Sequence, residues 1–439
     1  MMKLIKTVFV IFIYCVSFTA LHTQDIASLG ECLKIALENN YSLQIVKNEG
    51  EIAANDYTKG NAGLLPTVEA SAGYSGSIGG NSITGFSDNT VKTGGQFANS
   101  GSTGVNASWN IFSGYKAQAR YAQLRELKEI SDLNTQFEIE NLIANVAAEY
   151  YYLIQQERHR NNLQFILSIS KERVRIAAIN RELGSQSKLE LLQAQVDFNS
   201  DSSALVRQKQ QILASEIRLK TLMGALKHAH IMPDVSVLLL PELVYPNLLE
   251  KTLSENTRLQ IAAKQTNLSE YDLKIIRANS YPYLRLTSGY NYSFDFYNKG
   301  ATKKSSTRGL DYGLTFGVPI FDGGNRRREI KSAQIALKNR ELALLEAQLD
   351  VEAKLQEIYG SYSNYLVLVV MERQNLKTAH ENYEAAARRY RLGELAGIDM
   401  REAQNSLQDA EKRLLDVEYS AKVDEISLMM LSGNIMEYL

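Results

Sequence analysis

The sequence predicts a mainly helical fold that carries four amphipathic β-strands and consists of two copies of one structural unit. Three observations indicate this fold class. Two helical segments of the 439-residue chain are several times longer than the helices of ordinary globular domains. Four other segments alternate between apolar and polar residues, as strands do. The motifs of the first half also return in the second half in the same order.

Composition and charge exclude several classes of protein. The chain has 48 Lys and Arg against 49 Asp and Glu, and the basic residues are spread along it. A chain this close to neutrality has no electrostatic footprint for DNA or RNA, so we expect no nucleic-acid partner. Its 24 Tyr and only 6 Pro argue against a disordered or collagen-like chain.

The N-terminus has the layout of a secretory signal peptide, which we expect over residues 1–23. Lys3 and Lys6 precede an apolar run from Val8 to Ala20. Cys15 lies in that run without the small residues that precede a lipidated cysteine, so a lipoprotein is the lesser alternative. No later stretch is long and apolar enough to cross a bilayer as a helix. If the protein lies in a membrane, strands must cross it.

The two copies are registered by matched residues, which we interpret as an ancient duplication. At an offset of 216, Asn40 matches Asn256 and Pro66 matches Pro282, and at an offset of 209, Phe112 matches Phe321, Gly184 matches Gly393 and Gly224 matches Gly433. The seven residues between the offsets fall in one Gly-, Ser- and Asn-rich loop, 79–101. We therefore expect a first repeat at 24–224, a connector at 225–246 and a second repeat at 247–439 that ends in a short tail.

Each repeat is expected to run short helix, strand, strand, very long helix and second short helix. The predicted helices are 28–63, 115–183 and 187–223 in the first repeat, and 247–279, 325–392 and 398–432 in the second. Each long helix would span about 100 Å at a rise of about 1.5 Å per residue. The second long helix has two apolar seams, one including Ile330 and Leu337 and the other Ile335 and Leu342. Two seams need two neighbours, which favours a closed wall of helices, although an ordinary bundle shares the period.

Four strands are predicted from period-two hydrophobicity over about ten residues each. Their apolar residues are Val68, Ala70, Ala72 and Tyr74; Val105, Ala107, Trp109 and Ile111; Leu284, Leu286, Tyr290, Tyr292, Phe294 and Phe296; and Leu310, Tyr312, Leu314, Phe316 and Val318. One aromatic face and one polar face suit a strand between lipid and a watery lumen; a half-buried soluble hairpin is the alternative. Four strands are too few to close a membrane barrel, which needs about eight, so other copies of the chain must supply the rest.

Three kinds of motif, each present twice, carry a family resemblance. Each first strand begins at a proline followed eight residues later by tyrosine, Pro66 to Tyr74 and Pro282 to Tyr290. Each return strand ends in a short signature, "WNIFSG" at Trp109 and "VPIFDGG" at Val318. Each long helix ends at a turn, "NRELGSQSKLELLQAQ" from Asn180 and "YRLGELAGIDMREAQ" from Tyr390. In these motifs the chain resembles the TolC family of outer-membrane efflux proteins over essentially all of its mature length.

The resemblance implies a fold and a function. The fold would be a trimeric periplasmic α-barrel tunnel continuous with a 12-stranded transmembrane β-barrel. The function would be the outer-membrane exit channel of a tripartite efflux system in a Gram-negative bacterium, without enzyme activity, cofactor or metal. Its partners would be two further copies, outer-membrane lipid, a periplasmic adaptor and an inner-membrane transporter of RND, ABC or MFS type. Two alternatives remain: an exit duct for type I protein secretion, and a periplasmic adaptor or coiled-coil scaffold. The cargo cannot be deduced.

The resemblance also assigns roles to individual residues. Asp399 and Glu402 match the family carboxylates that ring the closed periplasmic mouth, although both could be solvated acids at a helix N-terminus. Glu190 and Tyr390 match one link between hairpins that holds this mouth shut. The arginine of a second link is replaced by Leu395, opposite Leu189. Adaptor contacts are expected at the hairpin turns, where the glycines also suit helix C-caps: Leu183, Gly184, Leu392 and Gly393. Strand–helix transitions are expected at Pro66, Phe112, Pro282, Pro319, Phe321 and Gly323.

An enzyme has little support in the sequence. His228 and His230 form a His-x-His pair in the connector, but no carboxylate or cysteine accompanies them, so we expect a solvated linker rather than a metal site. The run Arg326 to Arg328 at a helix start is interpreted as an interfacial anchor.

Overall fold

The computed structural model describes residues 28–84, 86, 90–184, 187–226, 231, 233, 243–298 and 302–438. The expected signal peptide and the pair His228 and His230 lie outside these residues. Two compact units divide the chain. A helical unit comprises the segment up to Val46 with Thr135–Thr257 and Gln348–Leu439, and a strand unit comprises Lys47–Asn134 and Arg258–Ala347. Each is described by itself.

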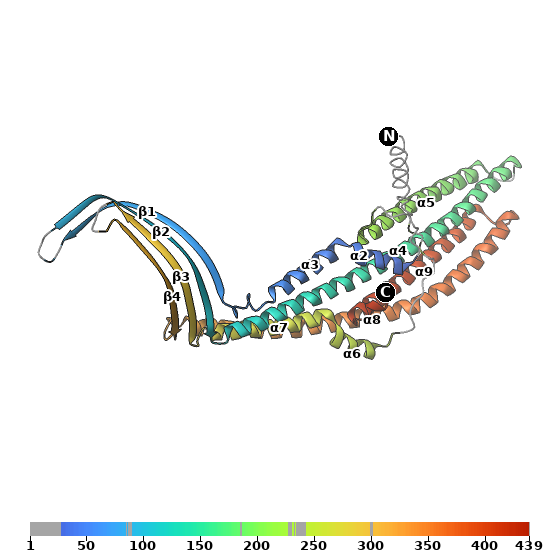
Figure 1. The fold of residues 1–439 in the computed structure, drawn as a ribbon. Coiled ribbons are helices and arrows are strands. Elements are labelled where there is room, and N and C mark those ends of the chain that lie inside the picture. Colours follow the sequence, from blue (N-terminus) through green and yellow to red (C-terminus); the bar gives the residue numbers. More distant parts are fainter. Residues whose placement is uncertain are drawn as a thin grey trace, which may run out of the picture. The chain divides into compact units, whose positions relative to one another are not determined.

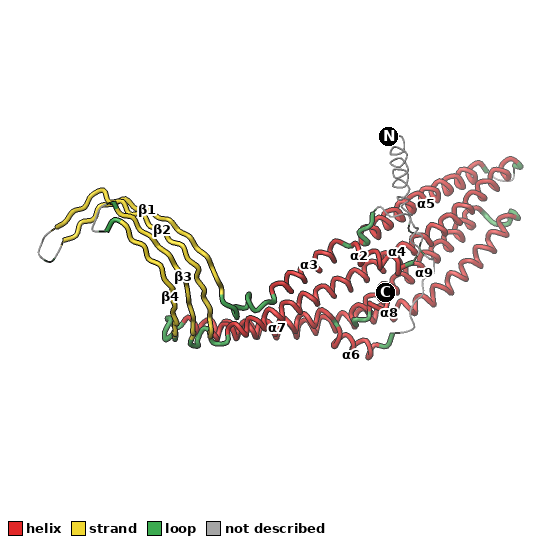
Figure 2. Tube along the Cα trace, viewed as in Figure 1, coloured by secondary structure: helices red, strands yellow, loops and turns green. Residues whose placement is uncertain are grey.

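The strand unit contains one four-stranded antiparallel sheet with the order β1-β2-β3-β4 (Figures 1 and 2). The strands are β1 (Thr67–Thr84), β2 (Thr90–Ser113), β3 (Tyr283–Tyr297) and β4 (Lys304–Gly317). Although 169 residues separate Ser113 from Tyr283, β2 pairs with β3. The two repeats therefore contribute adjacent hairpins to one continuous sheet.

The register places the four predicted apolar sets on one face of this sheet, except for Ile111, which falls at an irregularity between Asn110 and Phe112, and Val318, which follows the end of β4. Val105 lies opposite both Ala70 and Tyr290, and Tyr290 lies opposite Leu310. Residues directly opposite each other share a face, so the same alternation puts the polar sets together on the other face. There the Asn291 side-chain amide donates to Asp311 Oδ2 at 3.1 Å. The predicted division into an apolar and a polar face is confirmed.

The helices fall into matched sets from the two repeats. They are α2 (Leu29–Asn39), α3 (Tyr41–Asp56), α4 (Lys116–Glu182) and α5 (Lys188–Leu222), followed by α6 (Tyr245–Glu255), α7 (Thr257–Ala278), α8 (Asn325–Arg391) and α9 (Gly397–Leu431), with a short 3-10 helix η1 (Ile435–Tyr438). The helices α4 and α8 have 67 residues each, and α5 and α9 have 35 each. Among the described residues, no helix has the length and apolar character needed to cross a membrane.

The predicted helices 28–63 and 247–279 are each broken in two, at Asn40 and Asn256. Both asparagines have extended backbone, with ψ of 123° and 115°. The Asn40 side-chain amide donates to the Leu222 carbonyl at 2.8 Å, and that of Asn256 donates to the Leu431 carbonyl at 2.9 Å. These carbonyls end α5 and α9, where no intrahelical donor remains. The break thus lets each asparagine cap the end of another helix. The first helix also ends earlier than predicted, at Asp56.

The strand–helix transitions lie where the motifs predict turns. Pro66 and Pro282 directly precede β1 and β3. Phe112 is the penultimate residue of β2, and Gly114, directly after the strand, has φ of 64°. A Cβ at Gly114 would lie 2.5 Å from the Ala278 carbonyl oxygen, so only glycine fits there.

A second turn joins β4 to α8 and contains Pro319, Phe321 and Gly323. Gly323 has φ of 72°. Arg326, from the predicted basic anchor, holds this turn: its guanidinium donates to Asp322 Oδ2 at 2.9 Å and to the Pro319 carbonyl at 2.7 Å. Arg326 therefore stabilises the turn through hydrogen bonds within the chain, rather than serving only as the interfacial anchor that the sequence predicted.

The core of the helical unit lies where α2 meets α4 and α5. Leu33, Ile143, Leu219 and Met223 are fully buried there. Cys32 belongs to the same cluster, and burial raises the pKa of its thiol to about 12. A thiol with that pKa is inert at neutral pH, as expected for a packed residue.

Candidate functional site

The helical unit has two helical hairpins, the first formed by α4 and α5 and the second by α8 and α9. In each hairpin a glycine ends the long helix at the turn. Gly184 has φ of 75° and Gly393 has φ of 76°, the left-handed conformation of a helix C-cap. The Gly393 amide donates to the Tyr390 carbonyl at 3.1 Å. Leu183 and Leu392, which precede these glycines, expose about three quarters of their surface, 75% and 73%. Both turns thus present an apolar side chain for contact, and the adaptor role remains a prediction.

The carboxylates predicted for the aperture lie on one exposed face at the start of α9. Asp399 and Glu402 are exposed, whereas Met400, Ala403 and Gln404 between and beyond them are buried. The first turns of α9 therefore have a packed face and a charged solvent face. The structure places both acids together on the solvent face, as their spacing of three residues predicts.

Behind this face lies a buried polar network that sequence reasoning did not find. We call it the tip clasp, and it joins α4, α5 and α9 through Arg173, Asp197, Asp201, Arg401 and Gln404. The Arg401 guanidinium donates to both oxygens of Asp201, at 2.7 and 2.9 Å. Arg173 donates to Asp197 Oδ2 at 3.1 Å and to Gln404 Oε1 at 3.4 Å.

The clasp fixes the first turn of α9 to the first hairpin. Arg173 Nη2 donates to the Gly397 carbonyl at 3.0 Å, and Gln404 Nε2 donates to Ser170 Oγ at 2.9 Å. Arg173, Asp201 and Gln404 are at most 5% exposed. Buried charges of this kind are stable only when paired, and removing one partner leaves the other uncompensated. The network therefore specifies one docking position for α9.

A cavity lies beside the clasp, and both predicted link residues, Glu190 and Tyr390, line it. Its volume is about 420 Å³, and Arg173 and Arg401 also line it. Burial raises the pKa of Tyr390, the Arg173 charge opposes this rise, and Glu190 adds to it. Among the described residues of this single chain, no hydrogen bond joins Glu190 to Tyr390. Their link remains a prediction.

The leucines that replace the family's second link differ in their surroundings. Leu189 is exposed and lines the cavity. Leu395 packs against a cluster that contains Ile166, Tyr390 and Met400. Two apolar side chains cannot form the hydrogen bond of that link. Near the hairpin turns, the clasp supplies polar contacts between α9 and the first hairpin.

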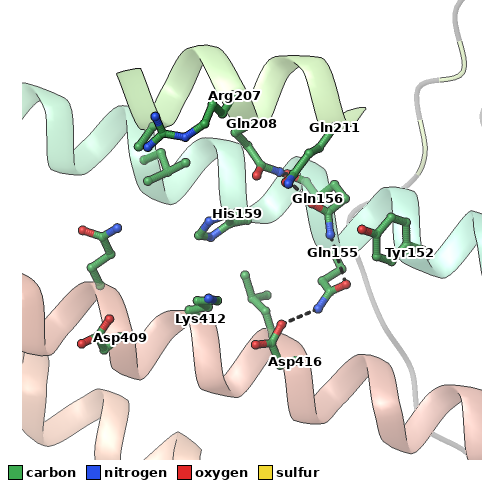
Figure 3. A pocket seen from close by; sticks show the side chains of 14 residues that line it. Tyr152, Gln155, Gln156, His159, Arg207, Gln208, Gln211, Asp409, Lys412 and Asp416 are labelled. Atoms are coloured by element: carbon green, nitrogen blue, oxygen red, sulfur yellow. Dashed lines mark hydrogen bonds between the residues drawn. The ribbon is translucent and has the colours of Figure 1, made fainter. Parts of the chain in front are cut away.

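A second cavity, of about 410 Å³, lies between α4, α5 and α9 (Figure 3). It is rich in glutamine: Gln208 donates to the Gln156 carbonyl at 2.8 Å, and Gln155 donates to Asp416 at 2.7 Å. His159 points into it, and burial together with the Lys412 charge lowers the pKa of this imidazole. Within the described part of the chain, no group of three or more His, Cys, Asp and Glu side chains could hold a metal ion.

A duplicated chain with one lipid-compatible sheet face, one polar sheet face and two long helical hairpins defines a subunit of a membrane channel with a helical extension. The chain belongs to the outer membrane efflux protein family, whose model matches residues 32–225 and 248–434.

Individual relatives agree with this assignment. Outer membrane protein TolC of Vibrio cholerae is 22% identical over 93% of this chain and 91% of its own length. Proteases secretion protein PrtF of Dickeya chrysanthemi is 21% identical over 93% and 88%. Cation efflux system protein CusC of Escherichia coli K12 is 22% identical over 91% and 84%. Crystal structures of CusC superimpose with a TM-score of 0.74, at 18% identity, over 94% of this chain and 95% of that one.

Membership confirms the predicted fold class, localisation and general function. The chain is one subunit of an outer-membrane exit channel for tripartite efflux, with a long periplasmic tunnel, and it is not an enzyme. Family members are homotrimers that work with adaptor proteins and inner-membrane pumps. Three subunits with four strands each make a barrel of twelve.

Proposed function

We propose that this channel is closed at its periplasmic end by the starts of its three α9 helices, with Asp399 and Glu402 around the opening. The observation that carries the proposal is the two-faced start of α9. Its buried face is fixed by the tip clasp, while its carboxylates remain exposed and without an ion-pair partner among the described residues. Six carboxylates around a narrow opening would attract cations and obstruct anions.

Ion selectivity in planar bilayers tests this proposal. We expect Asp399→Asn with Glu402→Gln to lower the ratio of cation to anion permeability of the trimer, with the largest effect at low salt because salt screens the charges. The matched control is Glu38→Gln, which removes an exposed carboxylate from α2. An unchanged ratio in the double variant, or an equal fall in the control, would refute the aperture assignment.

The second part of the proposal is that the tip clasp keeps the opening closed. Glu190 and Tyr390 line the cavity beside it, so a change at either residue alters the surroundings of Arg173. The leucines at positions 189 and 395 cannot form the family's second link, and the clasp supplies polar contacts between α9 and the first hairpin near the turns. Opening therefore requires α9 to leave the Asp201 carboxylate or to carry α5 with it.

We further propose that the exposed turn residues Leu183 and Leu392, with Gly184 and Gly393, meet the adaptor. The pump behind that adaptor would be of RND, ABC or MFS type. The relative CusC is named for cation efflux and the relative PrtF for protease secretion, so a type I secretion duct is the second candidate. Identification of the inner-membrane protein that copurifies with the cross-linked channel separates the two: an RND pump supports efflux, and an ABC transporter with a polypeptide cargo supports secretion.

A further inference from the structure

The apolar face of the sheet carries two basic side chains among its aromatic residues. Lys304 lies directly opposite Phe296, and Arg308 lies directly opposite Tyr292. These aromatic residues alternate in step with Leu286 and Tyr290, so both basic residues are on the apolar face. Both are exposed. Both lie on the second hairpin, beside the row of aromatic residues on β3.

Their height places them at the outer boundary of the membrane. The strands join the helices near Leu284, so the opposite end of the sheet faces the outside. Tyr292 is eight residues and Phe296 twelve residues beyond Leu284. At about 3.4 Å per residue and a tilt of about 40°, these residues lie about 20 Å and about 30 Å above it. Because the apolar band of such barrels is about 25 Å tall, Arg308 and Lys304 bracket its upper edge.

The surroundings of the two side chains suit the headgroup layer. The Lys304 ammonium lies 5.3 Å from the centre of the Phe296 ring. The rings of Tyr292, Phe294 and Phe296 form a row, with centres 6.2 and 5.9 Å apart. Aromatic and basic residues of this kind gather at membrane–water interfaces. Among the described residues neither Lys304 nor Arg308 has an ion-pair partner, so the opposite charge is to come from outside the chain.

We propose that Lys304 and Arg308 form a binding site for phosphate-bearing lipid of the outer leaflet. The two residues are four positions apart on β4, which is about 14 Å along the strand. At that spacing, a single phosphate could contact both side chains only if they bent toward each other. A glycolipid with a phosphate at each end of its sugar headgroup can instead engage Lys304 with one phosphate and Arg308 with the other. The Phe296 and Tyr292 rings beneath them provide the apolar surface for the first carbons of the acyl chains.

The test measures binding of named lipids to the purified trimer by the shift of its melting temperature. Titration with bisphosphorylated lipid A should stabilise the native channel, and monophosphorylated lipid A should bind more weakly. Each basic residue near an anionic surface contributes about a fivefold change in affinity, so Lys304→Gln with Arg308→Gln should weaken binding by about 30-fold. The exchange Lys304→Arg with Arg308→Lys should preserve it.

The matched control is Arg285→Gln. Arg285 lies on the polar face of the same sheet, where its Nε donates to Asn110 Oδ1 at 3.0 Å. This variant removes one positive charge from the sheet without changing the lipid face, so lipid binding should be unchanged. Equal affinity of the double variant and the native channel would overturn the proposal, as would an equal loss in Arg285→Gln. Stabilisation by inorganic phosphate alone, to the same extent, would show a free-anion site and would also overturn it.

Discussion

Replacing Arg401 by leucine tests the tip clasp directly. Arg401 makes two hydrogen bonds to Asp201, whose side chain is 6% exposed, while Arg401 itself is 20% exposed. Without Arg401 the Asp201 carboxylate stays buried with only Ser170 and Gln404 as donors. Loss of one partner of a buried pair costs about 3 to 5 kcal/mol, and the partial exposure of Arg401 places our expectation near the lower end, about 3 kcal/mol.

The assay combines thermal melting of the trimer, followed by helical circular dichroism, with conductance in planar bilayers. Arg401→Leu should lower the melting temperature and raise the closed-state conductance. Arg401→Leu with Asp201→Leu should recover most of the stability, because an apolar pair replaces the buried ions, while its conductance stays raised.

A more exposed arginine of α9, which pairs with a glutamate of α8, provides the control. Arg413 pairs with Glu372 at 3.2 Å and is 50% exposed, so Arg413→Leu should cost at most about 1 kcal/mol. If Arg401→Leu melts no lower than Arg413→Leu, Asp201 is not an uncompensated buried charge and our reasoning about the clasp is wrong. If stability falls as expected but conductance does not change, the clasp holds the fold and not the gate.

Three further predictions follow from other parts of the helical unit. Glu190→Ala or Tyr390→Phe should raise single-channel conductance, and unchanged conductance in both would count against their link. Burial raises the pKa of the Glu411 carboxyl, and one of its oxygens has no hydrogen-bond partner among the described residues. The free energy of unfolding therefore falls as pH rises through that raised pKa. Glu411→Gln should melt at a higher temperature than the native channel at pH 7, and the difference should vanish at low pH, where the carboxyl is protonated in both the folded and the unfolded state. Asn40→Ala and Asn256→Ala should each cost about 1 kcal/mol, measured as lower melting temperatures, because each leaves a helix-terminal carbonyl uncapped; a neutral effect would show that solvent replaces the cap.

Local periodicity explains why the strands and long helices could be predicted. The alternation around Tyr290 and the motif ending at Phe321 depend only on neighbours in the chain. Because the chain is duplicated, each pattern also occurs a second time and can be compared with its copy. The break at Asn40 could not be predicted in this way. Asparagine inside an otherwise periodic helix is only mildly unfavourable, and the partner that makes the break favourable, Leu222, is 182 residues away.

The tip clasp escaped prediction for a related reason. In sequence, Arg173 and Asp201 do not differ from the many charged residues on the solvent faces of long helices. Their burial follows from the packing of α4, α5 and α9 against one another. A weak signal was present at Arg401, which falls between Asp399 and Glu402 and so cannot share their face fully, because successive helical residues are about 100° apart.

If Asp399 and Glu402 surround the opening, as we propose, the position of Arg401 predicts that the aperture and the clasp are coupled. Asp399 and Glu402 would bring six like charges together around the opening of a trimer, and their mutual repulsion favours moving the three α9 helices apart. The contact between Arg401 and Asp201 opposes that movement from the other side of the same helical turn. Neutralising the aperture acids should therefore offset part of the conductance gained by Arg401→Leu, whereas two independent sites would give additive effects. Measurement of all three substitutions in one background separates these cases, and strict additivity would exclude the coupling.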